Sequence, residues 1–206
     1  MPRRSIRRGP VARRQWQAWD RDTGRSIRKY EAKQISNDDL EKIIEAGLYA
    51  PNAGGRQGSY IVAIHDPELA RKVGRLNRAT FNRQNLAGVY VSKEQPSIID
   101  DPSIKNAFYD APTVCAIFGP NNFLYSEADA YCCAENMVLM ATYLGISSCI
   151  ITRGKETFTM PEGQLLMKEW CVPDNYSGCC FVLLGYCEGE YPHEKSRKPG
   201  RYKIIN

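Results

Sequence analysis

Residues 126–151 read SEADAYCCAENMVLMATYLGISSCII, and no other stretch of the chain says more about the fold. Ser126 followed by Asp129 is typical of a helix start, and Gly145 is typical of a helix end. Apolar residues occur almost all the way round the helix between them, so the helix must be buried on nearly every side. In a domain of this size we expect such a helix to pack both inside its own chain and against a partner subunit.

Short apolar runs on both sides of this helix predict four β-strands. They are residues 59–65, 113–118, 147–152 and 179–187. Three further helices are predicted near residues 36–49, 68–86 and 161–170, and the second of these reads as one helix or two. Ser36 is the expected cap of the first, because Asp39 occupies its third helical position. The tail, residues 194–206, is basic and ends in a strand-like YKII with no obvious partner within the chain.

The composition indicates one folded domain preceded by a basic arm. A length of 206 residues is enough for a single domain with a sizeable core. The formal net charge of +5 comes from the first 28 residues, which hold nine arginines and two acids, whereas residues 29–206 hold 19 basic and 21 acidic side chains. We therefore divide the chain into an arm, residues 1–22, and a domain, residues 23–206.

An arginine-rich arm could bind nucleic acid or an anionic surface. The alternatives are a solvated tail and an over-extended start of translation, and we favour these. We therefore expect no nucleic-acid partner, although a nucleic-acid-associated protein that uses the arm stays open as an alternative function.

Compartment and metal content follow from what the sequence lacks. No apolar run approaches the roughly 20 residues that cross a bilayer, and the first residues lack the apolar segment of a secretory signal. We expect a cytoplasmic protein with no membrane partner, in which the eight cysteines are thiols. No C-x-x-C pair exists and the two histidines lie away from the cysteines, so no metal site is expected. We interpret four cysteines as small core residues: Cys132, Cys133, Cys149 and Cys180.

Several enzyme classes are excluded because their motifs are missing. The sequence has no G-x-G-x-x-G, no G-x-x-x-x-G-K-[ST] and no H-E-x-x-H, which argues against a Rossmann dinucleotide domain, a Walker-type NTPase and a zinc hydrolase. The absence of G-x-S-x-G removes support for a serine hydrolase.

Four segments in a fixed order instead resemble a known family. Residues 25–30 (RSIRKY) are similar to an R-R-S-x-R-x-[FY] opening, and residues 50–57 (APNAGGRQ) to an A-P-S-x-x-N-x-Q loop. Residues 144–151 (LGISSCII) are similar to L-G-[LI]-G-[ST]-C-W-I, and LGY at 184–186 with KSRK at 195–198 to the ending L-G-Y … K-x-R-x. Together they resemble the nitroreductase family of flavoproteins.

The resemblance implies the fold and the assembly. It implies an α+β fold with a central, mainly antiparallel sheet flanked by helices. It also implies a homodimer built around the long buried helix, with the C-terminal segment crossing to the partner and FMN bound at the interface.

The resemblance also implies a phosphate site made from both ends of the domain. Arg25, Arg28, Lys195 and Arg197 would meet the FMN phosphate, with Ser26 donating from its hydroxyl. Guanidinium and ammonium groups suit a phosphate because their contacts are charge-assisted. The alternative is that the two arginines continue the arm and that the tail residues are simply solvated.

The flavin ring would be contacted by other segments. Pro51, Asn52, Ala53 and Gln57 would lie along the isoalloxazine, with backbone groups and the glutamine reading its polar edge. Backbone amides near Thr152 and Arg153 would point at the N5 region, where a fixed donor stabilises charge arriving on the flavin. Either Asn77 or Asn82 would supply a further amide contact.

The expected activity is that of an FMN-dependent oxidoreductase. NAD(P)H would deliver hydride to the flavin, and a nitroaromatic, a quinone or a similar small acceptor would then take the electrons. No catalytic side chain is expected. A specialised or non-catalytic flavin-binding member of the same fold is the alternative within the family.

The sequence departs from the family pattern at several positions. Gly24 replaces the first arginine of the opening pair, and Gly55 replaces the loop asparagine. Gly58-Ser59 stands where Pro-Trp often follows the glutamine, and Ile150 replaces a tryptophan. The first change removes one phosphate contact, and the others weaken any assignment of the substrate pocket.

Overall fold

The computed structural model describes residues 25–82 and 91–205. The predicted arm and the end of the second predicted helix therefore lie outside the described residues. No helix in the described part of the chain is long and apolar enough to cross a membrane.

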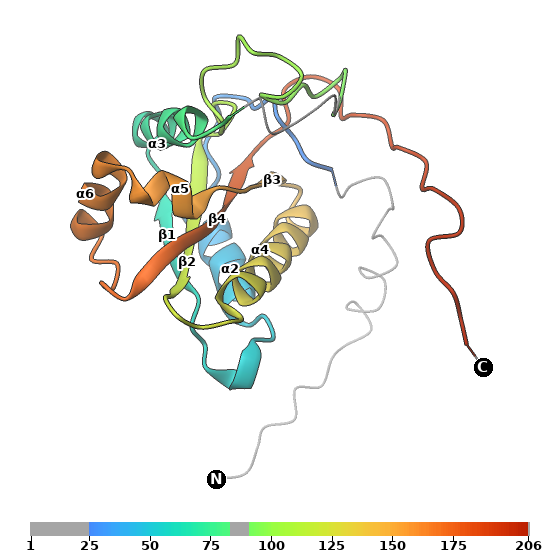
Figure 1. The fold of residues 1–206 in the computed structure, drawn as a ribbon. Helices are drawn as coiled ribbons and strands as arrows, with labels where there is room; N and C mark the ends of the chain where they lie inside the picture. The colour runs from blue at the N-terminus through green and yellow to red at the C-terminus, as the bar shows by residue number, and fades with distance from the viewer. Residues whose placement is uncertain (1–24, 83–90, 206) are drawn as a thin grey trace.

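The centre of the fold is a four-stranded antiparallel sheet (Figure 1). Its strands lie in the order β1-β2-β4-β3, and their bounds are Tyr60–Ile64, Thr113–Pro120, Tyr176–Gly185 and Ser147–Ile151 respectively. Every residue of β2 except Pro120 is buried, as expected for a central strand covered on both faces. The predicted α+β fold with a central antiparallel sheet is confirmed, and each predicted strand is present with shifts of a few residues at its ends.

Helices cover both faces of the sheet (Figure 1). α2 (Asn37–Leu48) and α4 (Ser126–Tyr143) pack on one face, while α3 (Pro67–Ala79), α5 (Gly154–Thr159) and α6 (Pro161–Glu169) lie on the other. Alternation along the strands divides the core accordingly, because successive side chains of a strand point to opposite faces. Ile117 and Val182 belong to the cluster beside α4, whereas Phe118 and Phe181 belong to the cluster beside α3 and α5.

Local sequence predicted the starts of two helices, and only one of them has a side-chain cap. The Ser36 hydroxyl accepts a hydrogen bond from the Asp39 amide at 3.1 Å, so the predicted cap of α2 is present. The predicted start of α4 at Ser126 is confirmed, but Tyr125 is its N-cap residue and the Ser126 hydroxyl donates to the carbonyl oxygen of Pro120. α5 was not predicted at all, because its six residues are too few to show a helical period.

The long helix α4 keeps an apolar outer side. Its inward residues, among them Ala134 and Met137, are fully buried against α2 and the sheet. α2 approaches closely at Gly47, where an added Cβ would lie only 2.6 Å from the Met137 side chain. The outer side includes Leu139, which is half-buried, and Cys132, which is exposed. The prediction that Cys132 is a core residue is therefore wrong, whereas Cys133, Cys149 and Cys180 are buried as predicted.

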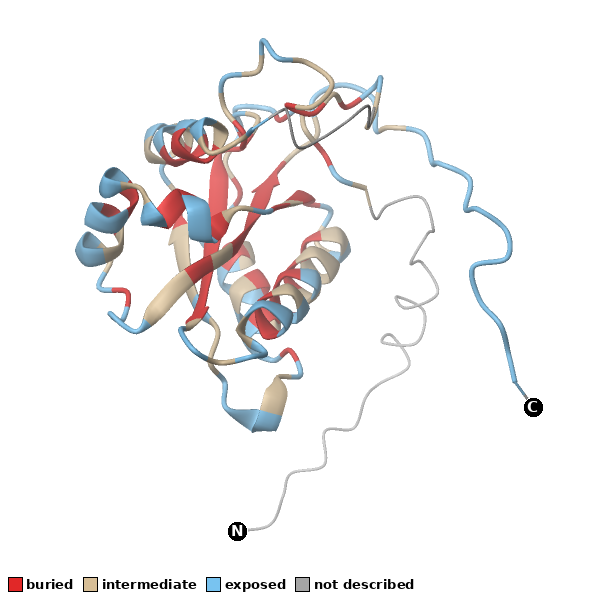
Figure 2. Ribbon diagram, viewed as in Figure 1, coloured by how far each residue is buried: buried red, intermediate tan, exposed pale blue. Residues whose placement is uncertain are grey.

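Residues 186–188 pair with residues 29–31 after β4 ends. From here on we call residues 188–205 the tail; all of them except Pro192 are exposed, and the tail ends away from the body of the molecule (Figure 2). It forms no strand with the described part of the chain. Three large apolar side chains near its end are more than 70% exposed, namely Tyr202, Ile204 and Ile205. Such residues are unusual on a free surface when they occur together.

Candidate functional site

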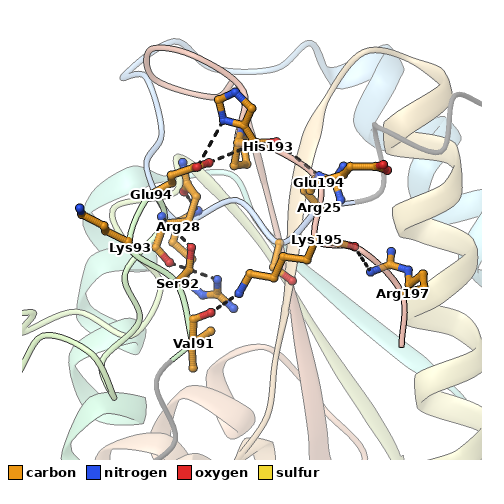
Figure 3. Close-up of a pocket in the computed structure, with 13 residues that line it drawn as sticks. Arg25, Arg28, Val91, Ser92, Lys93, Glu94, His193, Glu194, Lys195 and Arg197 are labelled. Carbon is orange, nitrogen blue, oxygen red and sulfur yellow. Dashed lines mark hydrogen bonds and ion pairs between the residues drawn. The ribbon is translucent and has the colours of Figure 1, made fainter. Parts of the chain in front are cut away.

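A cationic pocket of about 510 Å³ lies where three distant segments meet (Figure 3). Its walls come from residues 25–28, from residues 91–95 and from the tail, residues 192–197. Five cationic side chains line it, namely Arg25, Arg28, Lys93, Lys195 and Arg197. The structure thus brings together all the residues that the sequence assigned to a phosphate site, including Ser26.

The first wall is fixed to the edge of the sheet. Ser26 forms a parallel bridge with Ser148 of β3, and the Ile27 amide donates to the Ser148 carbonyl oxygen at 3.0 Å. Ile27 points into the core and is fully buried, so its neighbours Ser26 and Arg28 point outwards into the pocket. The sequence RSIR therefore presents its polar side chains because its isoleucine anchors the segment.

Arg25 joins the first wall to the tail. Its Nε donates to the carbonyl oxygen of Pro192 at 3.3 Å, and its guanidinium lies 3.8 Å from the carboxylate of Glu194. The Arg25 side chain is only 10% exposed. Arg25 thus has partners within the protein, whereas Arg197 hydrogen-bonds only the carbonyl oxygen of Lys195 among the described residues.

The second wall, residues 91–95, was missed by the sequence analysis. Gln95 is buried, and its side-chain oxygen accepts from the Arg28 amide at 2.6 Å. The Arg28 guanidinium in turn lies over the ring of Tyr109, 5.9 Å from its centroid. No sequence motif marks these residues, because they form neither a helix nor a strand. Hydrogen bonds from their backbone amides to a side chain outside the segment determine their conformation.

Asp100 organises the second wall. Its carboxylate accepts from the amides of Val91, Ser92 and Ser97, at 2.6, 3.2 and 2.8 Å, and from the Ser97 hydroxyl. Burial alone would raise the pKa of Asp100, but these hydrogen bonds outweigh burial and lower it. A charged carboxylate that satisfies several amides holds an irregular loop in one shape.

The second wall also contacts the tail directly. The carboxylate of Glu94 accepts from the His193 amide at 2.8 Å and lies 3.3 Å from its Nδ1. The hydrogen bond from the His193 amide lowers the pKa of Glu94. The ammonium of Lys195 donates to the carbonyl oxygen of Val91. Figure 3 shows these contacts across the pocket.

The loop with Pro51, Asn52, Ala53 and Gln57 lies elsewhere. Gly58 is next to Pro120 at one end of β2, while the cationic pocket adjoins the other end, where Thr113 pairs with Leu184 and Leu184 with Ser148. The eight residues of β2 put about 23 Å between its ends. Figure 1 shows the short helix η1 (Ala53–Gly55) at the far end of the sheet from residues 25–28. One chain therefore does not bring this loop to the pocket.

The loop nevertheless has a defined shape. Gly54, Gly55 and Gln57 have positive φ angles, which favour glycine at the first two positions. The Gln57 amide donates to the side-chain oxygen of Asn52 at 2.8 Å. The Ala53 amide donates to the carboxylate of Asp129 in α4 at 2.9 Å. The Asp129 side chain therefore accepts a hydrogen bond from the loop and not from its own helix.

The segment after β3 packs against α3 through a polar network. Arg153 has a φ of 65°, which turns the chain from β3 into α5. Its guanidinium donates to the side-chain oxygen of Asn77 at 2.6 Å and lies 5.2 Å from the Phe81 ring centroid. The Arg153 Nε is buried without a hydrogen-bond partner in the described part of the chain, and burial lowers the pKa of the guanidinium.

The two asparagine candidates differ in their surroundings. Asn77 is fully buried, and its amide donates to the Thr152 carbonyl oxygen at 2.9 Å and to the Thr157 hydroxyl at 3.0 Å. Asn82 is exposed just after α3. Asn77 therefore has protein partners for all of its side-chain polar atoms, and a ligand contact would have to replace one of them.

The described residues contain no group of three or more side chains that could hold a metal ion. All eight cysteines are free, and the buried ones are poor nucleophiles. Burial raises the pKa of Cys115 and of Cys133 to about 12. These thiols pack as small apolar side chains.

Comparison with known proteins agrees with this architecture. The sequence model of the nitroreductase family matches residues 23–186. The chain belongs to the nitroreductase family. An Archaeoglobus fulgidus protein named NADH dehydrogenase/NAD(P)H nitroreductase is 28% identical over 171 residues, which cover 82% of this chain and 83% of the relative. An NAD(P)H nitroreductase of Staphylococcus epidermidis is 27% identical and covers 81% of this chain and 84% of the relative.

Solved nitroreductase structures share the fold. A Bacteroides fragilis nitroreductase with bound FMN has a TM-score of 0.75 and 27% identity, covering 97% of this chain and all of the other. A Desulfitobacterium hafniense nitroreductase with bound FMN has a TM-score of 0.70 and 22% identity, covering 87% and 93%. Residues 25–28 and 91–95 of the cationic pocket fall inside the range that the family model matches, whereas residues 192–197 follow it.

Proposed function

We propose that the protein is an FMN-dependent NAD(P)H oxidoreductase and that the cationic pocket binds the FMN phosphate. The observation that carries this proposal is the convergence of Arg25, Ser26 and Arg28 with Lys195 and Arg197, about 170 positions apart in the sequence, on one pocket. The pocket volume of about 510 Å³ is within the usual range for small-molecule sites. The nitroreductase family and the FMN-bound relative from Bacteroides fragilis support the same cofactor.

The residues present fit a phosphate dianion. Arg28 presents a guanidinium from a wall that is hydrogen-bonded to the sheet, and Ser26 presents an exposed hydroxyl beside it. Lys195 and Arg197 would add two cations from the tail. Arg25 would also add positive charge, and its contacts with Pro192 and Glu194 hold the tail against the first wall.

FMN would supply the redox chemistry by accepting a hydride from NAD(P)H and passing electrons to a nitroaromatic, a quinone or a similar small acceptor. The protein's own contribution is to hold the phosphate, to orient the ring and to leave room for the two substrates in turn. The guanidinium of Arg153, which has no carboxylate partner within salt-bridge distance among the described residues, would add positive charge near the end of β3.

We infer that a homodimer completes the site. The loop at Pro51–Gln57 lies too far from the cationic pocket of its own chain, so a second copy would have to supply it. The half-buried outer side of α4 and the exposed apolar end of the tail are the surfaces that such a dimer would cover. Analytical ultracentrifugation tests the assembly, and a monomer that binds FMN fully would contradict it.

The cofactor proposal is tested by the absorbance spectrum of the purified protein. We expect flavin bands, after addition of FMN if necessary, that bleach when NAD(P)H is added without oxygen. A colourless protein that takes up no FMN would overturn the proposal. Bound flavin that NAD(P)H does not bleach would favour the non-catalytic alternative.

A further inference from the structure

Glu94 is an unexpected neighbour for a phosphate. A carboxylate in a cationic pocket repels an anionic ligand unless its charge is engaged elsewhere. In this pocket the other carboxylate, Glu194, faces Arg25 at 3.8 Å, whereas Glu94 faces the tail at His193. Each carboxylate therefore has a protein partner, and the partner of Glu94 is mainly a backbone amide.

The contact between Glu94 and His193 joins two walls that are 99 residues apart in the sequence. The His193 amide donates to Oε2 of Glu94 at 2.8 Å, and the imidazole Nδ1 lies 3.3 Å from Oε1 (Figure 3). We call this pair of contacts the clasp. Both side chains are more than half exposed, so the clasp lies at the rim of the pocket and not in its floor.

One side of the clasp belongs to a wall that is hydrogen-bonded within itself, and the other belongs to an exposed segment. The second wall is held by hydrogen bonds from the Val91 and Ser92 amides to Asp100 and by the bond from the Arg28 amide to Gln95. The tail forms no strand, and its residues 193–205 are exposed. The clasp therefore attaches the tail to a preformed wall. Arg25 also holds the tail, through Pro192 and Glu194, and Lys195 donates to Val91. Because Lys195 and Arg197 follow His193 by only two and four residues, the clasp acts together with these contacts to set their position.

We propose that Glu94 is a positioning residue for the cofactor: the clasp holds the tail across the pocket so that Lys195 and Arg197 stay within reach of the phosphate. This inference rests on the proposed function, because it assumes that FMN binds in the cationic pocket. Loss of the clasp should increase the rate at which FMN leaves more than it changes the rate at which FMN binds, since the first wall stays intact.

The test measures FMN release after dilution of the loaded protein, by the fluorescence of free FMN. Glu94→Ala removes both contacts of the clasp, and we expect about 3- to 10-fold faster release. His193→Ala keeps the backbone amide and removes only the imidazole contact, so we expect the rate of FMN release to rise less than about 3-fold. Glu94→Gln keeps an acceptor for the amide and should rescue most of the loss. Glu190→Ala, an exposed carboxylate outside the pocket, is the matched control and should release FMN at the wild-type rate.

The double variant Glu94→Ala/His193→Ala separates the clasp from two independent effects. If the two residues act through one contact, the double variant should release FMN no faster than Glu94→Ala alone. The inference would be overturned if the double variant released FMN at a rate equal to the product of the two single effects, or if Glu94→Ala released FMN at the wild-type rate.

A wild-type protein that takes up no FMN would instead overturn the proposed function, so the two failures are distinguishable. The thermal midpoint of the FMN-free variants should stay at the wild-type value, and a large decrease would indicate a general folding role that contradicts a positioning role.

Discussion

The backbone amide of Ala53 donates a 2.9 Å hydrogen bond to the carboxylate of Asp129, which links the loop at residues 51–57 to the first turn of α4. Asp129 is only 8% exposed, so its carboxylate has little access to water as an alternative partner. The loop that we expect to reach a partner's flavin is therefore held by the helix that we expect to form the dimer interface.

Replacing Asp129 by alanine should loosen this loop. The Ala53 amide would lose its acceptor, and we expect a loss of about 1 kcal/mol in stability together with faster amide hydrogen exchange at residues 53–57. Hydrogen exchange followed by mass spectrometry would show the effect. Asp129→Asn keeps an acceptor oxygen and should restore most of the protection. Glu127→Ala, on the exposed side of the same turn, should leave the exchange unchanged.

Replacing Asp100 by asparagine should destabilise the second wall in a pH-dependent way. An amide group would present N–H donors to amides that now donate to the carboxylate, so we expect a loss of about 1 kcal/mol at neutral pH. The pKa of Asp100 is lowered in the folded protein, so its stabilising contribution is present above the unfolded pKa of about 3.9 and is lost as the pH falls below that value.

Urea unfolding of the Asp100→Asn variant and the wild type at several pH values checks this expectation. The difference between the two proteins should be constant between about pH 5 and pH 7 and should shrink below about pH 4. A difference that grows as the solution becomes more acidic would contradict the assigned role of the carboxylate.

Replacing Gly154 by alanine should destabilise the packing of α5 on β4. An added Cβ would lie 2.7–2.9 Å from the backbone atoms of Cys179, which cannot move away as a flexible side chain could. We expect a loss of about 1–3 kcal/mol, measurable as a lower thermal midpoint. Gly58→Ala is the matched control, since its Cβ would meet Pro120 only at 3.4 Å, and it should lower the midpoint much less.

The sequence predicted the parts of the fold that depend on local patterns. The apolar runs predicted all four strands, and the Ser36–Asp39 spacing predicted the start of α2 correctly. The family resemblance named five residues that line the cationic pocket, and the structure brings them together: Arg25, Ser26, Arg28, Lys195 and Arg197.

The remaining parts depend on contacts between distant residues. The sequence marked Asp129 only as part of a helix start, because the pattern does not show that the Ala53 amide, 76 positions earlier, donates to its carboxylate. The second wall was missed because it is an irregular segment. Its shape depends on the Asp100 carboxylate, which accepts hydrogen bonds from several backbone amides. The separation of the Pro51–Gln57 loop from the pocket depends on their adjoining opposite ends of β2, which the order of the motifs along the sequence does not reveal.

Removing two cations from opposite walls should greatly weaken FMN binding without unfolding the protein. Arg28→Ala/Arg197→Ala removes one guanidinium from residues 25–28 and one from the tail, and we expect at least a 100-fold weaker affinity because each charge-assisted contact contributes about 1.5–3 kcal/mol. Equilibrium titration with FMN measures the affinity, and circular dichroism checks the fold. Lys29→Ala/Lys198→Ala removes the same charge from neighbouring residues that do not line the pocket, so it should bind FMN nearly as the wild type does. Equal losses in the two double variants would mean that net charge, and not the geometry of the pocket, controls binding.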